Sequence, residues 1–333
     1  MKQLAASVAG KWLPTRRIRR VHRKVLVEAE ILSQQYWLHR RGVAFFNFWE
    51  TGVNENRWFA RFLQRPALSR LTLKRRVAFV SVFGDPRVVD RITADATIFF
   101  TGENPATRLA YADQMIGAVD LSLGFDRQQQ PGYLRFPLWL LMCFEAEFTL
   151  PEVERRLLSW TEQRSTVGSR PKMEASMVAR YDPDGSRART ADVFGRYGRV
   201  HYGGAFRATG PTIPPGGQHK EAFLRRFPFN ICPENSARSG YVTEKVFDAV
   251  AAGCIPIYAG PPDAIEPGIL NEDAVLRYPL NQPEALSREL AELRDRPGYL
   301  RDWSERPPFC PGAAERIYAY YLELEKRLVD LLQ

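Results

Sequence analysis

The feature that most constrains the fold is a repeated unit in which a short apolar run stops at a glycine and polar residues follow. The first half of the chain contains three such units, "RRVAFVSVFG" (75–84), "DATIFFTGENP" (95–105) and "VDLSLGFD" (119–126). Runs of this length, rich in β-branched and aromatic residues and bounded by turn residues, are typical of buried strands. Because helix-length segments separate them, they favour a parallel sheet with a site at its carboxyl edge.

The second half of the chain repeats this strand–loop–helix rhythm. Its clearest part is a strand at 227–232, a loop at 233–242, a helix at 243–252 and a strand at 254–258, which together form one βαβ unit. Gly253 is expected to stop the helix. The remaining predicted elements are a strand within 172–180, a helix at 186–198 and an amphipathic helix from about Gly312 to Leu332.

The length of the chain indicates more than one domain. At 333 residues it exceeds what one hydrophobic core usually organises. We therefore predict an α/β protein with two Rossmann-like domains facing a cleft. The predicted divisions are a basic helical N-terminal extension (1–75), a first domain (76–168), a second domain (169–312) and a C-terminal helix (313–333) that could pack back across the domains.

Positive charge is concentrated at the start of the chain, whose net charge is +9. Residues 1–27 favour an anionic partner such as phospholipid headgroups, nucleic acid or a phosphorylated ligand, and the alternative is a solvated helix face. No nucleic-acid partner is expected, because no recognisable nucleic-acid-binding module accompanies the charge. The segment contains no acidic residue, and its basic residues are Lys2, Lys11, Arg16, Arg17, Arg19, Arg20, Arg23 and Lys24.

The sequence also indicates the cellular compartment of the protein. The apolar stretch "FPLWLLMCF" (136–144) is far shorter than the roughly 20 residues needed to cross a bilayer. No signal peptide is recognised at the start. The four cysteines are scattered without the paired spacing of zinc or redox sites. A reducing, cytoplasmic location is therefore expected.

The predicted helix at 243–252 begins with adjacent charges of opposite sign, Glu244 and Lys245, after a natural N-cap residue, Thr243. A helix N-terminus presents unpaired N–H groups and a partial positive charge, which suit a phosphate. Lys245 would add a full positive charge, and Glu244 could accept hydrogen bonds from the hydroxyls of a sugar attached to the phosphate. The alternative is a solvated pair on a surface helix.

The stretch "FPFNICPENSARSGYVTEKVFDAVAAGCIPIYAGPP" (227–262) resembles the signature of the family-10 glycosyltransferases, the α-1,3/1,4-fucosyltransferases, in their bacterial form. "FFTGENP" (99–105) and "DLSLGFD…YLRFPLWL" (120–140) resemble acceptor-domain motifs of the same family, so the resemblance covers about residues 76–330. It implies a metal-independent GT-B enzyme without a cofactor, which transfers L-fucose from GDP-β-L-fucose with inversion.

The resemblance also implies roles for individual residues. Glu103 occupies the place of the proposed general base; the alternative for it is a hydrogen-bond acceptor within its loop. Lys245 is similar to the lysine that binds the diphosphate, and Glu244 to the residue that contacts fucose. Arg187 most resembles the arginine that holds the phosphates, although Arg189 is close enough in sequence to take that role.

Further residues are expected around the two substrates. Asn235 and Tyr241 are similar to residues near the nucleotide, but Tyr241 could equally pack against the helix. Phe83, Asp85 and Asp126 are the acceptor-side candidates; the two aspartates end neighbouring strands and are reserve candidates for the base.

Some positions depart from the family pattern. Pro233 replaces a usual aromatic residue, Val82 and Phe83 replace two tryptophans, and "GAFRATGPTIPPGGQHK" (204–220) fits no motif. We predict an α-1,3-type fucosyltransferase that acts on a GlcNAc-containing surface glycan or its lipid-linked precursor, with residues 1–27 against the inner face of the membrane. The alternatives are the same fold with another GDP-sugar, such as a mannose- or heptose-type donor, or a non-catalytic glycan- or nucleotide-binding module.

Overall fold

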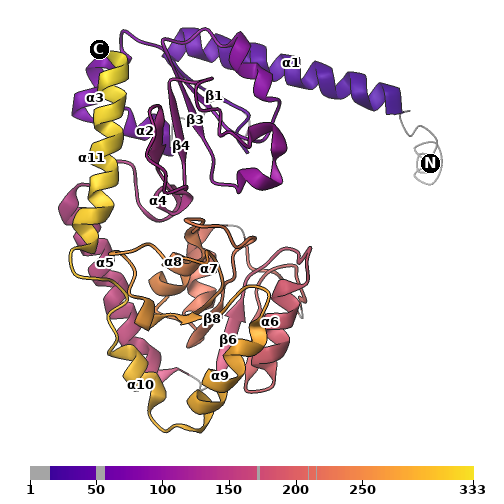
Figure 1. The fold of residues 1–333 in the computed structure, drawn as a ribbon, viewed down its shortest axis with the longest axis vertical. Helices are drawn as coiled ribbons and strands as arrows, with labels where there is room; N and C mark the ends of the chain where they lie inside the picture. Colours follow the sequence, from indigo (N-terminus) through magenta and orange to yellow (C-terminus); the bar gives the residue numbers. More distant parts are fainter. Residues whose placement is uncertain (1–15, 50–56, 171–172, 209, 215) are drawn as a thin grey trace, which may run out of the picture.

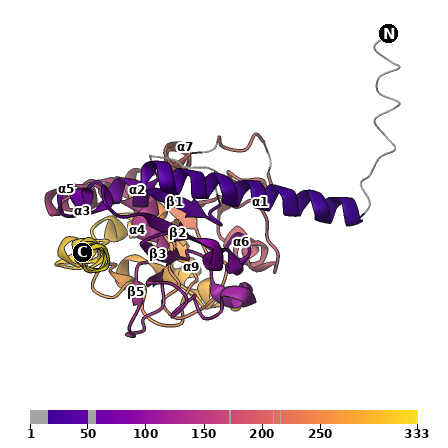
Figure 2. The same ribbon diagram turned by 90° about the horizontal axis from the view of Figure 1, so that it is seen from above.

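The computed structural model describes residues 16–49, 57–170, 173–208, 210–214 and 216–333. Two α/β domains are stacked along the long axis of the molecule, and each is built around a five-stranded parallel sheet (Figure 1). The predicted pair of Rossmann-like domains is therefore confirmed. Helix α1 (Arg16–Arg41) lies along the first domain, and its amino-terminal part projects beyond the sheet (Figure 2).

Strand order in the first sheet follows the chain, β1-β2-β3-β4-β5. The register aligns Phe45, Phe79, Ile98 and Leu121 across four strands, and these side chains belong to one core. Alternate residues point to the other face, towards α1. Burial on both faces explains the continuous apolar runs from which β2, β3 and β4 were predicted. The elements are β1 (Val43–Phe46), α2 (Trp58–Phe62), α3 (Pro66–Thr72), β2 (Val77–Val80), β3 (Ala96–Phe100), β4 (Leu121–Gly124), β5 (Tyr133–Arg135), α4 (Leu138–Cys143) and α5 (Leu150–Ser165).

The first domain begins earlier than the predicted boundary at residue 76. β1 lies inside the segment 1–75, and it pairs in parallel with β2 along its whole length. Helices α2 and α3 of the same segment also contribute to the core of this domain. Because β1 has only four residues and three of them are buried, "VAFF" has neither the length nor the alternation that marks a strand in a sequence.

The second sheet has the order β10-β9-β8-β6-β7. The chain passes from β6 to β7 on one side and then returns to β8 on the other side of β6. The junction between β6 and β8 is therefore a topological switch point, where a crevice opens at the carboxyl ends of parallel strands. The elements are β6 (Glu174–Met177), α6 (Ser186–Gly195), β7 (Arg199–Tyr202), α7 (Gly217–Leu224), β8 (Phe229–Ile231), α8 (Glu244–Ala251), β9 (Ile255–Tyr258), β10 (Leu276–Arg277), α9 (Leu286–Asp295), α10 (Tyr299–Ser304) and α11 (Ala313–Leu332).

The predicted βαβ unit is present as β8, α8 and β9. The apolar face expected for α8 is buried, with Val246 and Ala249 fully enclosed. Gly253 ends the helix with φ +71°, the left-handed conformation that favours glycine at this place. A β-carbon there would lie 2.3 Å from the carbonyl oxygen of Gln163, so no other residue fits without a shift of the backbone.

The two domains are joined by apolar packing and by the last helix. Trp139 of α4 stacks on Phe247 of α8, with the ring centroids 4.5 Å apart. Helix α11 returns to the first domain, where it runs beside α3 (Figure 1). There, Arg65 pairs with Glu325 at 3.0 Å. These contacts fix how the carboxyl edges of the two sheets face each other.

Candidate active site

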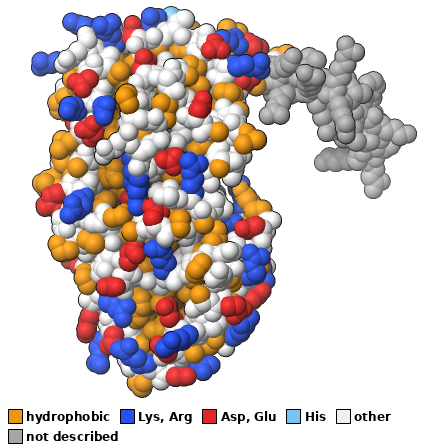
Figure 3. Space-filling model, viewed as in Figure 1, with side chains coloured by type: hydrophobic (Ala, Val, Ile, Leu, Met, Phe, Trp, Pro, Cys, Tyr) orange, Lys and Arg blue, Asp and Glu red, His pale blue; other side chains and the backbone are white. Residues whose placement is uncertain are grey.

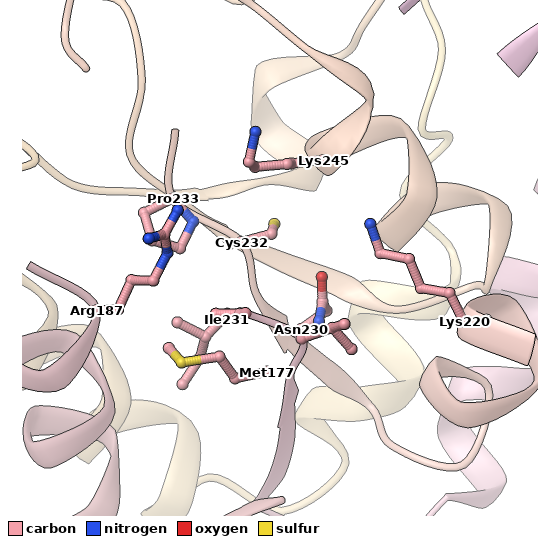
Figure 4. Close-up of a pocket in the computed structure, with 10 residues that line it drawn as sticks. Met177, Arg187, Lys220, Asn230, Ile231, Cys232, Pro233 and Lys245 are labelled. Atoms are coloured by element: carbon pink, nitrogen blue, oxygen red, sulfur yellow. The ribbon is translucent and has the colours of Figure 1, made fainter. Parts of the chain in front are cut away.

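A pocket lies at the switch point of the second sheet. The ends of β6 and β8 supply its floor, and three basic side chains from three different helices reach it (Figure 4). These are Arg187 from the first turn of α6, Lys220 from α7 and Lys245 from the first turn of α8. Their convergence makes the pocket suitable for an anion. The complete lining is Met177, Val178, Ala179, Arg187, Lys220, Asn230, Ile231, Cys232, Pro233 and Lys245.

Lys245 is held by a buried carboxylate that the sequence interpretation did not single out. Its Nζ lies 3.0 Å from Oε2 of Glu234 and 2.8 Å from Oγ1 of Thr243. The Glu234 side chain is fully enclosed, and it also accepts a hydrogen bond from the Tyr258 hydroxyl. Glu244, the neighbour expected to matter most, is 4.0 Å from Nζ. The main counter-ion of Lys245 is therefore Glu234.

The charges of this cluster are mutually stabilised. Burial alone would lower the pKa of Lys245, but the attraction of Glu234 and Glu244 outweighs it and raises the pKa above its ordinary value. For Glu244, burial would raise the pKa, and the positive charges of Lys245 and Lys220 outweigh it and lower the pKa. Both residues are therefore charged at neutral pH.

Lys220 is the functional candidate that the sequence interpretation missed most completely. It belongs to the segment 204–220 that fits no motif, and it is placed by α7 rather than by a strand end. Its Nζ pairs with Asp248 at 2.5 Å, and Asp248 projects from α8. The usable signal was weak, since it consisted only of a lysine in a helix that follows a Gly- and Pro-rich loop.

The structure separates the two candidate arginines. Arg187 lines the pocket, where its guanidinium donates to the carbonyl of Tyr181 at 2.6 Å and to Oδ1 of Asn235 at 2.5 Å. Both acceptors are neutral oxygens, so its positive charge stays available to a ligand. Arg189 instead donates to the carbonyl of Asp184 and lines a different depression beside Pro283. Of the two, Arg187 is the one that shares a pocket with Lys245.

The start of α8 differs in one respect from the expected phosphate site. Thr243 occupies the N-cap position, but its side chain does not cap the helix. Its N–H and its hydroxyl are both within 2.9 Å of the Glu234 carboxylate. A buried carboxylate thus already occupies the Thr243 N–H. The Thr243 N–H is therefore not available to an incoming anion.

Glu103 lies in the first domain, in a loop whose next residue, Asn104, donates a hydrogen bond of 2.9 Å to Ser236 of the second domain. It follows β3, and in the described part of the chain its carboxylate has no hydrogen-bond or ion-pair partner. The Tyr241 side chain is buried, and its ring packs on Phe125 with centroids 4.9 Å apart. Burial raises the pKa of Tyr241, and the negative charges of Glu234 and Glu103 act in the same direction. Tyr241 is therefore a packing residue of the domain interface, buried against Phe125 of the first domain.

Asp126 is used to join the domains. Arg238, from the loop after β8, donates to its carboxylate at 2.7 Å and to Oδ1 of Asn104 at 3.1 Å. Gln114 donates to the same carboxylate at 2.6 Å. Gly240 in this loop has φ +72° and approaches the Phe125 carbonyl so closely that a β-carbon would lie 2.7 Å from it. The loops at the two carboxyl edges therefore contact each other directly.

A second pocket lies in the first domain at the ends of β1 and β2, and α1 forms one wall. Phe83 and Asp85 both line it, whereas Asp126 does not. Phe83 and Trp49 meet edge to face with centroids 5.9 Å apart, and both are partly exposed. Arg87 donates to Asp85 and keeps its pKa below the usual range. The lining residues are Val27, Glu28, Glu30, Ile31, Phe46, Asn47, Phe48, Trp49, Val82, Phe83, Gly84, Asp85, Arg87 and Arg108.

Two further observations concern metals and membranes. Within the described ranges, no three or more His, Cys, Asp or Glu side chains gather in a way that could hold a metal ion. In those same ranges, no helix combines the length and the apolar character needed to span a bilayer.

Comparisons with known proteins identify the family. Residues 43–142 match the sequence model of the α-(1,3)-fucosyltransferase FucT N-terminal domain, and residues 167–306 match that of the glycosyltransferase family 10 (fucosyltransferase) C-terminal region. The chain is 28% identical over 209 residues to the α-(1,3)-fucosyltransferase FucT of Helicobacter pylori. That match covers 54% of this chain and 41% of the relative, so the chain spans less than half the length of that curated protein.

Two solved structures share the fold. A crystal structure of an α1,3-fucosyltransferase with GDP-fucose has a TM-score of 0.54 and 20% identity, covering 85% of this chain and 90% of its own. A crystal structure of an α1,3-fucosyltransferase described without a ligand has a TM-score of 0.56 and 20% identity, covering 85% and 89%. Since both family models match in the expected order along one chain, the protein belongs to glycosyltransferase family 10, the fucosyltransferases.

Proposed function

We propose that the protein is an inverting, metal-independent transferase that moves L-fucose from GDP-β-L-fucose to a hydroxyl of a glycan acceptor, with an α-1,3-type linkage. Membership of the family and the donor named for the related crystal structure support the choice of substrate. The observation that carries the proposal is the pocket at the switch point, where Arg187, Lys220 and Lys245 converge. Glu103 approaches from the other domain.

The three basic residues would bind the diphosphate of the donor. When the bond between the fucose anomeric carbon and the β-phosphate oxygen breaks, GDP leaves with additional negative charge. Arg187 can stabilise the negative charge of GDP because, in the described structure, no carboxylate neutralises its own guanidinium. Glu234 keeps Lys245 protonated. The lysine ammonium would therefore supply the positive charge for which other enzymes use a metal ion. Activity should therefore persist in a chelator such as EDTA.

Glu103 would act as the general base. It would accept the proton of the acceptor hydroxyl while that oxygen bonds to the anomeric carbon from the face opposite the departing GDP, which inverts the configuration. No ion pair occupies the Glu103 carboxylate within the described residues. Glu244, with a lowered pKa, would remain ionised and accept hydrogen bonds from the sugar hydroxyls.

The first-domain pocket would hold the acceptor. Its aromatic rim, formed by Trp49 and Phe83, suits the apolar face of a sugar ring, and Asp85 suits a hydroxyl. We propose a GlcNAc-containing surface glycan or its lipid-linked precursor as acceptor, a cytoplasmic location, and contact of residues 1–27 with an anionic membrane. Residues 1–15 of that segment lie outside the described residues.

A transfer screen tests the proposal. GDP-fucose and other GDP-sugars are each combined with a panel of glycan acceptors, with and without EDTA, and products are identified by mass spectrometry. Fucosylated products, formed equally in EDTA, are expected. Fast turnover of a mannose- or heptose-type donor with none of GDP-fucose would overturn the choice of sugar, and binding without transfer of any donor would show a non-catalytic module.

A further inference from the structure

We propose that α1 is an interfacial helix that binds an anionic lipid bilayer through an apolar stripe on its outer side. The stripe consists of Val25, Ala29, Leu32 and Tyr36, which recur at i, i+4, i+7 and i+11 and therefore share one helix face. Val25, Leu32 and Tyr36 expose 58%, 64% and 59% of their surfaces. Three large apolar side chains this exposed on one face indicate a surface that is covered when the protein works.

The stripe is separate from the face by which α1 packs on its own domain. Ile31, Gln34 and Leu38 are buried against the first sheet, and Gln34 accepts a hydrogen bond from the Phe45 N–H. The helix is thus already fixed to the fold by one side. Its outer side is free to meet a partner without any rearrangement of the domain.

The charge around α1 identifies the partner. Residues 1–27 supply eight of the nine net positive charges of the chain, so the rest of the protein is nearly neutral. Figure 3 shows acidic and basic side chains interspersed on the face in view, in both domains. Glu28, the acidic residue nearest the stripe, forms two hydrogen bonds of 2.8 Å with Arg91. An apolar face combined with a surplus of lysine and arginine is the pattern of helices that lie in the interface of anionic membranes.

A second copy of the chain fits the stripe less well. From Val25 to Tyr36 the stripe spans only about 17 Å of helix, which is short for a stable two-helix interface. Parallel pairing would also bring two strongly basic segments together. An anionic bilayer instead satisfies the apolar side chains and the charge at once.

If the first-domain pocket holds the acceptor, as the proposed function has it, membrane binding by α1 also determines where the acceptor enters. Val27, Glu28, Glu30 and Ile31 of the same helix form a wall of the first-domain pocket. A helix lying in the membrane interface would therefore hold that pocket at the lipid surface. An acceptor glycan carried on a lipid could then enter it without leaving the membrane.

Vesicle flotation of the full chain tests the inference without any transfer reaction. Vesicles of phosphatidylcholine, with or without phosphatidylglycerol, are floated at low and high salt. Binding to the phosphatidylglycerol vesicles, weakened by salt, is expected. Leu32→Glu should reduce the partition coefficient by about tenfold to a hundredfold, because a side chain that would be buried in lipid becomes charged. The matched control is Leu322→Glu, since Leu322 is 53% exposed on α11 and should not affect binding.

Four outcomes decide the inference. Absence of vesicle binding by the wild type would overturn it, even if fucose is transferred to a soluble acceptor. Equal losses for Leu32→Glu and Leu322→Glu would also overturn it, as would a wild-type dimer in light scattering that Leu32→Glu dissociates. Selective loss of binding in Leu32→Glu, with unchanged turnover of a soluble acceptor and unchanged thermal unfolding, would support it.

Discussion

The two sheets have the same number of parallel strands but different strand orders, and this difference separates two kinds of site. The first sheet follows the chain from β1 to β5, so it contains no switch point. Its pocket needs α1 and the aromatic residues after β1 and β2 to complete its walls. In the second sheet, β7 is added on one side of β6 and β8 on the other, so the strand order reverses at β6. The pocket of this sheet lies in the crevice created there.

The chemistry of the two pockets follows from this geometry. At a switch point the loops from neighbouring strands diverge, so helices α6, α7 and α8 can each direct one cation to the same place. This suits a compact anion such as a diphosphate. The first-domain pocket has Trp49 and Phe83 on its rim and acidic residues beside arginines, which suits a neutral sugar. The comparison therefore predicts that variants in the two pockets affect different substrates.

The largest effect is expected at Glu103, the proposed general base. Glu103→Gln should lower kcat by about 10²- to 10⁴-fold, because it removes the proton acceptor and leaves the shape nearly unchanged. The Kd for the GDP-sugar should not change. Steady-state transfer assays and calorimetric titration measure the two quantities. Glu154→Gln, on an exposed part of α5, is the matched control, and a similar loss there, or a full rate in Glu103→Gln, would contradict the role of base.

The next largest effect should distinguish the two neighbouring arginines. Arg187→Ala should lower kcat/KM by about 10²- to 10³-fold, because it removes the cation whose charge is not neutralised in the pocket. The KM for the acceptor should be unaffected. Arg189→Ala, two residues away but outside the pocket, should change turnover less than about twofold. If Arg189→Ala is the damaging substitution, the diphosphate is bound elsewhere.

The elements with strong local signals could be predicted from the sequence. α8 combines an apolar face with a terminal glycine, and β2, β3 and β4 are uninterrupted apolar runs. In each, the helix or strand preference of the residues and their burial pattern indicate the same element. β1 could not be recognised, because four residues buried in parallel pairing have no periodicity. The switch point also could not be deduced, since strand order depends on which side of β6 each connection passes.

The site residues divide in the same way. Lys245, Glu244 and Arg187 could be proposed from the sequence because they begin helices after predicted strands or lie in a dense motif; the structure places Lys245 and Arg187 in one pocket. Glu234 was passed over because its role depends on burial beneath Lys245, and that contact joins residues eleven positions apart through a loop. Lys220 depends on the packing of α7 against α8, which local sequence does not reveal.

A smaller effect should show how the second-domain pocket is maintained. Glu234→Gln should reduce the free energy of unfolding by about 2–3 kcal/mol, since it leaves a largely buried ammonium without its main counter-ion. The pKa of Lys245 is raised in the folded state, so the pair stabilises the fold fully below the unfolded pKa of about 10.4. That contribution is lost as the pH rises towards the folded value. The difference between variant and wild type in urea unfolding should therefore be constant from about pH 6, where carboxylates are ionised, up to about pH 10, and narrow above it.

The control for this measurement is Glu292→Gln, which removes the exposed pair with Arg288 on α9. It should change the free energy of unfolding by less than about 0.5 kcal/mol at every pH. If Glu234→Gln behaves in the same way, Lys245 is not held by Glu234. The difference between the two pockets would then rest on Arg187 and Lys220 alone.

The smallest effect concerns the first-domain pocket. Phe83→Ala should raise the KM for the acceptor by about three- to tenfold, because the rim loses one of its two aromatic rings. The Kd for the GDP-sugar should stay the same, since the ring lies outside the pocket of the second sheet. Leu109→Ala, which truncates a more exposed apolar side chain of the same domain, should change neither constant. An uncharged aromatic rim is not expected to affect the binding of a diphosphate. A change in donor affinity without a change in acceptor KM would therefore show that the two pockets do not bind different substrates.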